Sequence, residues 1–189
     1  MLDERGAIVI AVGRDAAKLD AVAATERFVC DLADEDAVAA LADEIEVAFG
    51  HVDGLLHLVG GWRPGHSPDD FAWLEERLLT TLRNATLAFH DDLTSSPAGR
   101  LAIVSSTGVD KPTWSNANYS TLKAAAEAWV ASIASGWRKD GTAAVVTFVV
   151  PSIGAGAGHT SVSKVAEHLA AVWELDPGRL NGSRVPLTP

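Results

Sequence analysis

Apolar and polar residues follow each other along the chain in blocks that predict buried strands separated by helices. The strands are short apolar runs rich in β-branched residues, and turn-forming or charged residues bound them. They are expected at residues 7–13, 27–30, 53–60, 100–106 and 143–150, with a possible sixth at 183–189. Between them, apolar side chains recur every three or four positions, which predicts helices at residues 14–24, 34–49, 71–93, 119–137 and 161–175.

Strands that are apolar on both faces and alternate with helices are typical of a parallel sheet covered on both sides. We therefore predict an α/β fold, a doubly wound parallel sheet of the Rossmann-like type, with one domain over residues 1–189. Ligands bind such sheets beyond the carboxyl ends of the strands. Polar or turn-forming residues follow each of the first five strands there: Arg14, Asp31, Gly60 with Gly61, Ser105 with Ser106, and Pro151 with Ser152.

The segment NANYSTLK, residues 116–123, holds the only tyrosine of the chain, Tyr119, one helical turn before Lys123. Residues four apart share one face of a helix, so both side chains are expected to point into the same space. An ammonium close to a phenol is expected to lower the pKa of Tyr119, which suits proton transfer. Ser106, at the tip of the preceding strand, is placed to hydrogen-bond a substrate carbonyl or alcohol. The trio suits carbonyl–alcohol interconversion, with a nicotinamide cofactor supplying the hydride.

Composition removes several classes of partner. The 25 acidic and 15 basic side chains give a formal charge of −10, which disfavours nucleic acid and anionic lipid as partners. Cys30 is the only cysteine, so neither an intrachain disulfide nor a cysteine-based zinc site is expected, and we assign no metal ligand. The sequence shows neither a signal-peptide pattern nor an apolar run of membrane-spanning length, and a cytoplasmic location is the expectation.

The sequence resembles the short-chain dehydrogenase/reductase family along nearly its whole length, most closely in NANYSTLKAAAEAW at residues 116–129. In that family a Tyr-x-x-x-Lys pair follows a strand-end serine by 13 residues, which is the spacing from Ser106 to Tyr119. The resemblance implies that Tyr119 is the catalytic acid/base and that Ser106 orients the substrate oxygen. It also implies that Lys123 binds the nicotinamide ribose and lowers the pKa of Tyr119.

The resemblance extends to the cofactor, with Arg14, Asp31, Gly60, Lys123 and Pro151 as the binding residues. Arg14 stands where family members that prefer NADP often carry arginine, so NADP is expected and NAD remains possible. An ordinary solvated arginine is an equally good interpretation of Arg14. Asp31 matches the aspartate that usually contacts adenine, and its alternative is capping of the following helix.

The chain also departs from the family pattern. Residues 57–61, HLVGG, stand in place of the Asn-Asn-Ala-Gly motif, and only Gly60 matches. The fourth catalytic member, an asparagine, would fall near Thr80 or Thr81, and Asn84 lies about one turn away and is not assigned. The family's first strand and Gly-rich phosphate turn have no counterpart, so we expect an N-terminally truncated version of the fold. Residues 7–13 must then pair with 53–60, or leave an apolar edge exposed.

The leading hypothesis is an NAD(P)-dependent oxidoreductase acting on a small carbonyl or alcohol. The alternative is a non-catalytic, possibly dimeric scaffold with impaired cofactor binding. A Ser-His-Asp hydrolase is disfavoured because the chain has no G-x-S-x-G segment. We also expect a homodimer or homotetramer in which helices 71–93 and 119–137 pack against their copies, through small residues with Trp129 and Trp137 beside them.

Overall fold

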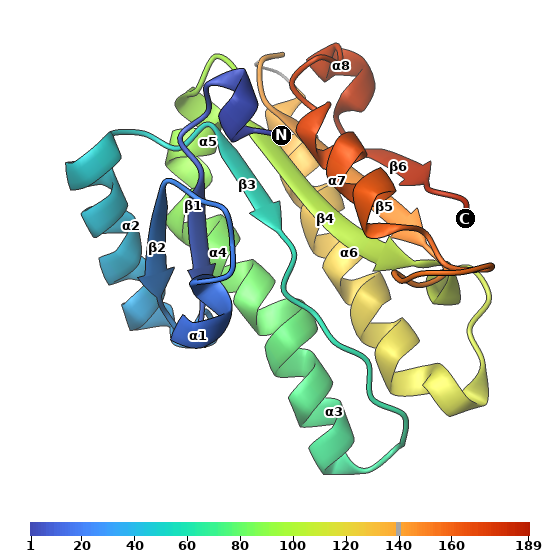
Figure 1. The fold of residues 1–189 in the computed structure, drawn as a ribbon. Coiled ribbons are helices and arrows are strands. Elements are labelled where there is room, and N and C mark those ends of the chain that lie inside the picture. The colour runs from blue at the N-terminus through green and yellow to red at the C-terminus, as the bar shows by residue number, and fades with distance from the viewer. Residues whose placement is uncertain (139–140) are drawn as a thin grey trace.

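The strands are all parallel and lie in two separate sheets (Figure 1). The computed structural model describes residues 1–138 and 141–189. One sheet pairs β1 (Ile10–Gly13) with β2 (Glu26–Val29), and the other has the order β3 (Gly54–His57), β4 (Arg100–Ser106), β5 (Ala144–Val150) and β6 (Ser183–Pro186). The sixth strand is therefore formed, while the first and third are shorter than the apolar runs that predicted them.

Between β1 and β3 the described residues form no strand pairing, so the apolar edge of each strand stays open. A cavity of about 860 Å³ lies there. Of the two arrangements that the sequence left open, direct pairing of residues 7–13 with 53–60 is therefore wrong. We refer to this cavity as the slot between β1 and β3.

Helices cover both faces of the sheets, which confirms the doubly wound α/β fold (Figure 1). On one face, α2 (Glu35–Phe49), α4 (Thr81–Ala88), α5 (His90–Ser95) and α6 (Ala117–Trp137) pack against apolar residues of β1, β3, β4 and β5. On the other face, α7 (Val162–Ala170) and α8 (Pro177–Leu180) pack against β4 and β5. Short helices η1 (Asp3–Arg5), α1 (Ala16–Leu19), η3 (Thr107–Val109) and η4 (Trp114–Asn116) lie in the connections.

The sequence determines where several helices begin. The Asp34 carboxylate accepts the Ala37 N–H and starts α2, whose first turn is acidic, as the helix dipole favours. Ser67 and Asp70 form a capping box at the start of α3 (Pro68–Glu75). No helix in the two described ranges is both long and apolar enough to cross a bilayer.

The helix expected at residues 71–93 is interrupted. It runs as α3, a π turn η2 (Glu76–Thr80), α4 and α5. A π turn inserts an extra residue into the helical ladder and is frequent at functional sites. Past this turn, two indoles of α6 donate to threonines of α4 and α5: Trp129 to Thr86 and Trp137 to Thr94, each at 2.8 Å.

A pair of glycine substitutions tests the packing of the sheet. A Cβ at Gly54 on β3 would lie 2.3 Å from Cζ2 of Trp173, whereas one at Gly136 near the end of α6 would meet nothing within 4 Å. We expect Gly54→Ala to lower the free energy of unfolding by about 1–3 kcal/mol through overpacking. Gly136→Ala should raise it by up to about 1 kcal/mol, because alanine is the better helix former. Urea denaturation measures both, and effects of the same sign would contradict this packing.

Candidate active site

Ser106, Tyr119 and Lys123 come together at the carboxyl end of β4. Ser106 is the last residue of β4 and pairs with Val150, so its backbone is fixed by the sheet. Tyr119 and Lys123 lie in the first turns of α6, which buries Leu122, Ala126, Val130 and Ala134 toward the sheet and the neighbouring helices. The structure thus places Ser106 next to Tyr119, with Lys123 one turn further along α6.

The Ser106 hydroxyl has two polar neighbours. It accepts the N–H of Gly108 at 3.1 Å, which ties it to the turn that follows β4. It also lies close enough to the Tyr119 hydroxyl to lower the pKa of the phenol.

The pKa of Tyr119 nevertheless moves opposite to the expectation from the sequence. Burial raises it above its usual value of 10, and the neighbouring Ser106 side chain offsets only part of that increase. Lys123 does not lower it, because its ammonium donates instead to the carbonyl of Val104 at 2.7 Å. The prediction that lysine tunes this tyrosine downward is therefore wrong for this structure, and Tyr119 is a neutral phenol at neutral pH.

The contact of Lys123 follows from the length of β3. Backbone groups of alternate β4 residues face β3, as shown by the Arg100 N–H donating to the Asp53 carbonyl. Pairing of the two strands stops at His57 and Ile103, so the Val104 carbonyl on the same side is free for the ammonium. Burial lowers the pKa of Lys123 to about 8, and Glu127 opposes the shift.

A fourth side chain, not assigned from the sequence, lies near this lysine. His57, the last residue of β3, is buried, and its Nε2 lies 3.3 Å from Oγ1 of Thr81. The Thr81 hydroxyl donates its one proton to the Arg77 carbonyl at 3.0 Å, so it accepts from Nε2–H of His57. Burial, followed by the charge of Lys123, lowers the pKa of His57 to about 4. The sequence offered one sign that this position is unusual: in HLVGG, His57 stands where the family motif has asparagine.

The cofactor candidates line the same edge of the sheets. Arg14 follows β1 and pairs with Glu76 at 3.2 Å and Asp31 at 3.7 Å, which brings two separately predicted residues together. Asp31 also accepts the N–H of Ala33 at 3.0 Å within the loop, whereas the cap of α2 is Asp34, so the alternative of helix capping by Asp31 is wrong. Asn84 donates to the carbonyls of Leu32 and Ala33 and so supports this loop, away from Lys123.

Two further candidates mark strand ends. Gly60 lies in the loop after β3, and Pro151 directly follows β5. An added Cβ at Gly60 would make only an ordinary 3.8 Å contact with Leu78, whereas one at Gly61 would lie 2.7 Å from Trp73. Close packing therefore requires glycine at Gly61 rather than at Gly60.

The sequence also matches a known protein family. The family model of the short chain dehydrogenases matches residues 1–168. The chain belongs to the short-chain dehydrogenase family. Its members are oxidoreductases, so the protein is placed among enzymes of that class. No curated protein sequence matches significantly.

Solved structures share the short-chain dehydrogenase fold at low sequence identity. An NADPH-bound short-chain oxidoreductase from Pseudomonas aeruginosa PAO1 with an atypical catalytic centre has a TM-score of 0.88 and 17% identity, covering 98% of this chain and 87% of the other. A 3-ketoacyl-(acyl-carrier-protein) reductase from Brucella melitensis complexed with NADH has a TM-score of 0.87 and 18% identity, covering 98% and 88%. A gluconate 5-dehydrogenase from Burkholderia cenocepacia J2315, with NADP and tartrate, has a TM-score of 0.80 and 19% identity, covering 97% and 84%.

The buried His57 of this short-chain dehydrogenase predicts a pH dependence of stability. The unfolded chain protonates this histidine below about pH 6.5, and the folded chain does so only below about 4. The unfolded state therefore binds more protons between these values, and stability falls as the pH falls, by about 3 kcal/mol over the full range. We expect His57→Asn to remove this part of the dependence in urea denaturation at pH 7 and 4.5.

The same conclusion can be checked without a variant. In an NMR titration, the His57 ring should stay neutral until the pH approaches 4. Protonation of His57 near pH 6.5 would contradict the burial seen here.

Proposed function

We propose that the protein interconverts a small carbonyl compound and its alcohol, with a nicotinamide cofactor, at Ser106, Tyr119 and Lys123. The observation that carries the proposal is the grouping of two neighbouring hydroxyls and one buried ammonium at the carboxyl end of β4. When bound, the cofactor supplies or accepts the hydride. The substrate itself stays unassigned beyond this chemical class.

Each residue has a definite role in this proposal. Ser106 hydrogen-bonds the substrate oxygen and holds it beside Tyr119. Since the pKa of Tyr119 is raised, its phenol carries a proton at neutral pH and donates it to the oxygen as a carbonyl is reduced. Lys123, with a pKa near 8, is still largely charged at neutral pH and can donate to cofactor hydroxyls. Alcohol oxidation needs the phenolate, so its rate should keep rising in the alkaline range.

The residues present fit the two ends of a nicotinamide dinucleotide. Lys123 and the two hydroxyls suit the nicotinamide ribose and the reacting oxygen, and Arg14 and Asp31 suit the adenosine end. Within residues 1–138 and 141–189, no strand lies between β1 and β3, and no strand-to-helix turn stands at that point of the edge. The backbone N–H groups that would hold the pyrophosphate are thus not supplied by the described residues.

Replacement of Tyr119 is the direct test of the proposed chemistry. We expect Tyr119→Phe to lower NADPH oxidation, measured by absorbance with a panel of small ketones and aldehydes, by about 100-fold or more. Ser120→Ala is the matched control, because it also removes one buried hydroxyl and that hydroxyl has no partner in the described part of the chain. Equal rates for the two variants would refute the role of Tyr119.

The charges around Arg14 generate a prediction on cofactor choice. A charge-assisted hydrogen bond to a 2′-phosphate is worth about 1.5–3 kcal/mol, so Arg14→Ala should weaken NADPH binding by about 10- to 100-fold and NADH binding little. Glu76→Gln should strengthen NADPH binding, because Glu76 competes for the same guanidinium. Calorimetric titration of both cofactors measures these effects. An equal loss for NADH and NADPH would show that Arg14 does not read the phosphate.

The open slot favours a second candidate, a non-catalytic scaffold with impaired cofactor binding. If the unaltered chain binds neither NADPH nor NADH at millimolar concentration, this alternative is the better one for residues 1–189.

Assembly through α4 and α6 fits both functions. Assembly is supported by exposed small residues on α6, namely Ala124, Ala128, Ala131 and Ser135. Trp129 and Trp137 do not support it, because each donates a hydrogen bond within the chain.

A further inference from the structure

One guanidinium on the edge strand β6 reaches across to the candidate active site. The side chain of Arg184 faces α6, while its neighbour Val185 packs with Leu187 on the side of α7. Its Nε donates to Oε2 of Glu127 at 2.9 Å, and its Nη2 lies 3.4 Å from Oε1 of the same carboxylate. Its Nη1 donates to the Asp110 carboxylate at 3.0 Å. A planar fork that contacts both oxygens of a carboxylate fixes its position more strictly than a point charge does.

Glu127 is the centre of this network. Its Oε1 accepts a hydrogen bond from the hydroxyl of Ser105, the residue directly before Ser106 on β4. Glu127 also follows Lys123 by one turn of α6, so the two side chains share one face of the helix. Ser105 and Arg184 thus draw the carboxylate toward β4 and β6, although a buried ammonium lies within one turn of it.

Asp110, the second carboxylate bound by Arg184, belongs to the turn after β4. It ends η3, and within this short helix the Gly108 N–H donates to the Ser106 hydroxyl. By binding Asp110 and Glu127 together, Arg184 connects this turn with α6. A charged side chain of β6 therefore contacts the two segments that carry the candidate catalytic residues.

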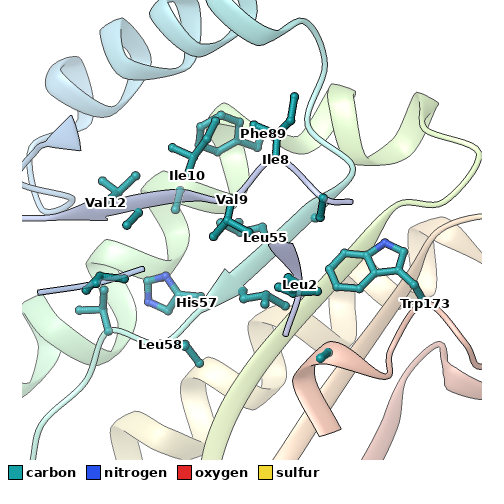
Figure 2. Close-up of a pocket in the computed structure, with 18 of the residues that line it drawn as sticks. Leu2, Ile8, Val9, Ile10, Val12, Leu55, His57, Leu58, Phe89 and Trp173 are labelled. Carbon is teal, nitrogen blue, oxygen red and sulfur yellow. The ribbon is translucent and has the colours of Figure 1, made fainter. Parts of the chain in front are cut away.

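Glu127 is the charged group that acts on Lys123. Burial lowers the pKa of this lysine to about 8, and Glu127 opposes the shift. On β3, His57 lines the slot between β1 and β3 (Figure 2), and burial keeps it neutral above about pH 4. Tyr119 on α6 is a neutral phenol at neutral pH, and Glu76 on η2 pairs with two arginines instead. The charge of Lys123 above neutral pH hence depends on where the Glu127 carboxylate lies.

We propose that Arg184 is a positioning residue that acts on Lys123 through Glu127. Its guanidinium holds the carboxylate against Ser105, which limits the support that Glu127 gives to the charged form of the lysine. In the proposed function Lys123 donates to cofactor hydroxyls, and a charged donor does so more strongly than a neutral amine. Arg184 therefore sets the pH above which the site loses this donor. The catalytic part of this inference rests on the proposed function, whereas the effect on Lys123 does not.

Titration of Lys123 in the full chain tests the inference directly. Lysine labelled with carbon-13 at Cε reports its own pKa by NMR, and Lys123→Arg identifies the signal. We expect Glu127→Gln to lower the pKa of Lys123 by about half a pH unit or more, because the amide keeps an acceptor for Ser105 but loses the charge. Arg184→Gln should raise it by a similar amount, because the released carboxylate can turn toward the ammonium.

Further variants test the route of the effect. Arg83 and Glu35 form an exposed ion pair at 3.4 Å between α4 and α2, and Arg83→Gln and Glu35→Gln should leave the pKa of Lys123 unchanged. Arg184→Lys keeps the positive charge without the planar fork, so it should shift the pKa less than Arg184→Gln. In the Glu127→Gln background, Arg184→Gln should have less than half of its single effect, because its route to Lys123 has been removed.

The pH profile of NADPH oxidation separates this inference from the proposed function. The alkaline limb of kcat/KM should move to lower pH in Glu127→Gln and to higher pH in Arg184→Gln. Shifts of both signs by NMR in a chain without NADPH-dependent activity would support the positioning role and refute the proposed function.

Two results would overturn the positioning role of Arg184. The first is a pKa of Lys123 that neither Glu127→Gln nor Arg184→Gln changes, and the second is an equal effect of Arg184→Gln in both backgrounds. If Arg184→Gln fails to fold, as judged by circular dichroism, Glu127→Gln and Arg184→Lys decide the question. An unchanged pKa in both of these variants then refutes the inference.

Discussion

The parallel register between β4 and β5 is the interaction on which the candidate active site depends. Seven residue pairs, from Arg100 with Ala144 to Ser106 with Val150, join two strands that are almost entirely buried. This pairing places the Ser106 hydroxyl at the edge of the sheet and the buried face of α6 over β4. Because β3 stops earlier, the Val104 carbonyl receives the Lys123 ammonium. A slip of one residue would turn Ser106 to the other face and dismantle the site.

The β1–β2 pair is attached to the rest by a different kind of force. Within the described residues no strand pairing links this pair to β3. It is attached by Ile10, Val12 and Phe28, which pack against the core beneath α2 and α4. Apolar contacts are less directional than backbone hydrogen bonds. The half that carries Arg14 and Asp31 is therefore positioned less strictly than the half that carries Ser106, Tyr119 and Lys123.

Pattern and spacing predicted the fold class, the strand order along the chain and the meeting of Ser106 with Tyr119, because these depend on local periodicity and on parallel topology. They did not predict the π turn at residues 76–80, since its residues read as ordinary helix. The pKa of Tyr119 was also missed. The direction of this pKa shift depends on burial and on where the Lys123 side chain points. Neither can be inferred from the four-residue spacing between Tyr119 and Lys123.

The two indole–threonine bonds between α6 and α4–α5 have a mechanical consequence. The two bonds are eight residues apart on both sides: Trp129 and Trp137 on α6, and Thr86 and Thr94 on α4 and α5. The two helical segments therefore keep the same register at both contacts. Sliding one helix past the other by a single turn, about 5.4 Å, would break both bonds together rather than one after the other. The two bonds together therefore resist sliding of α6 along α4 and α5.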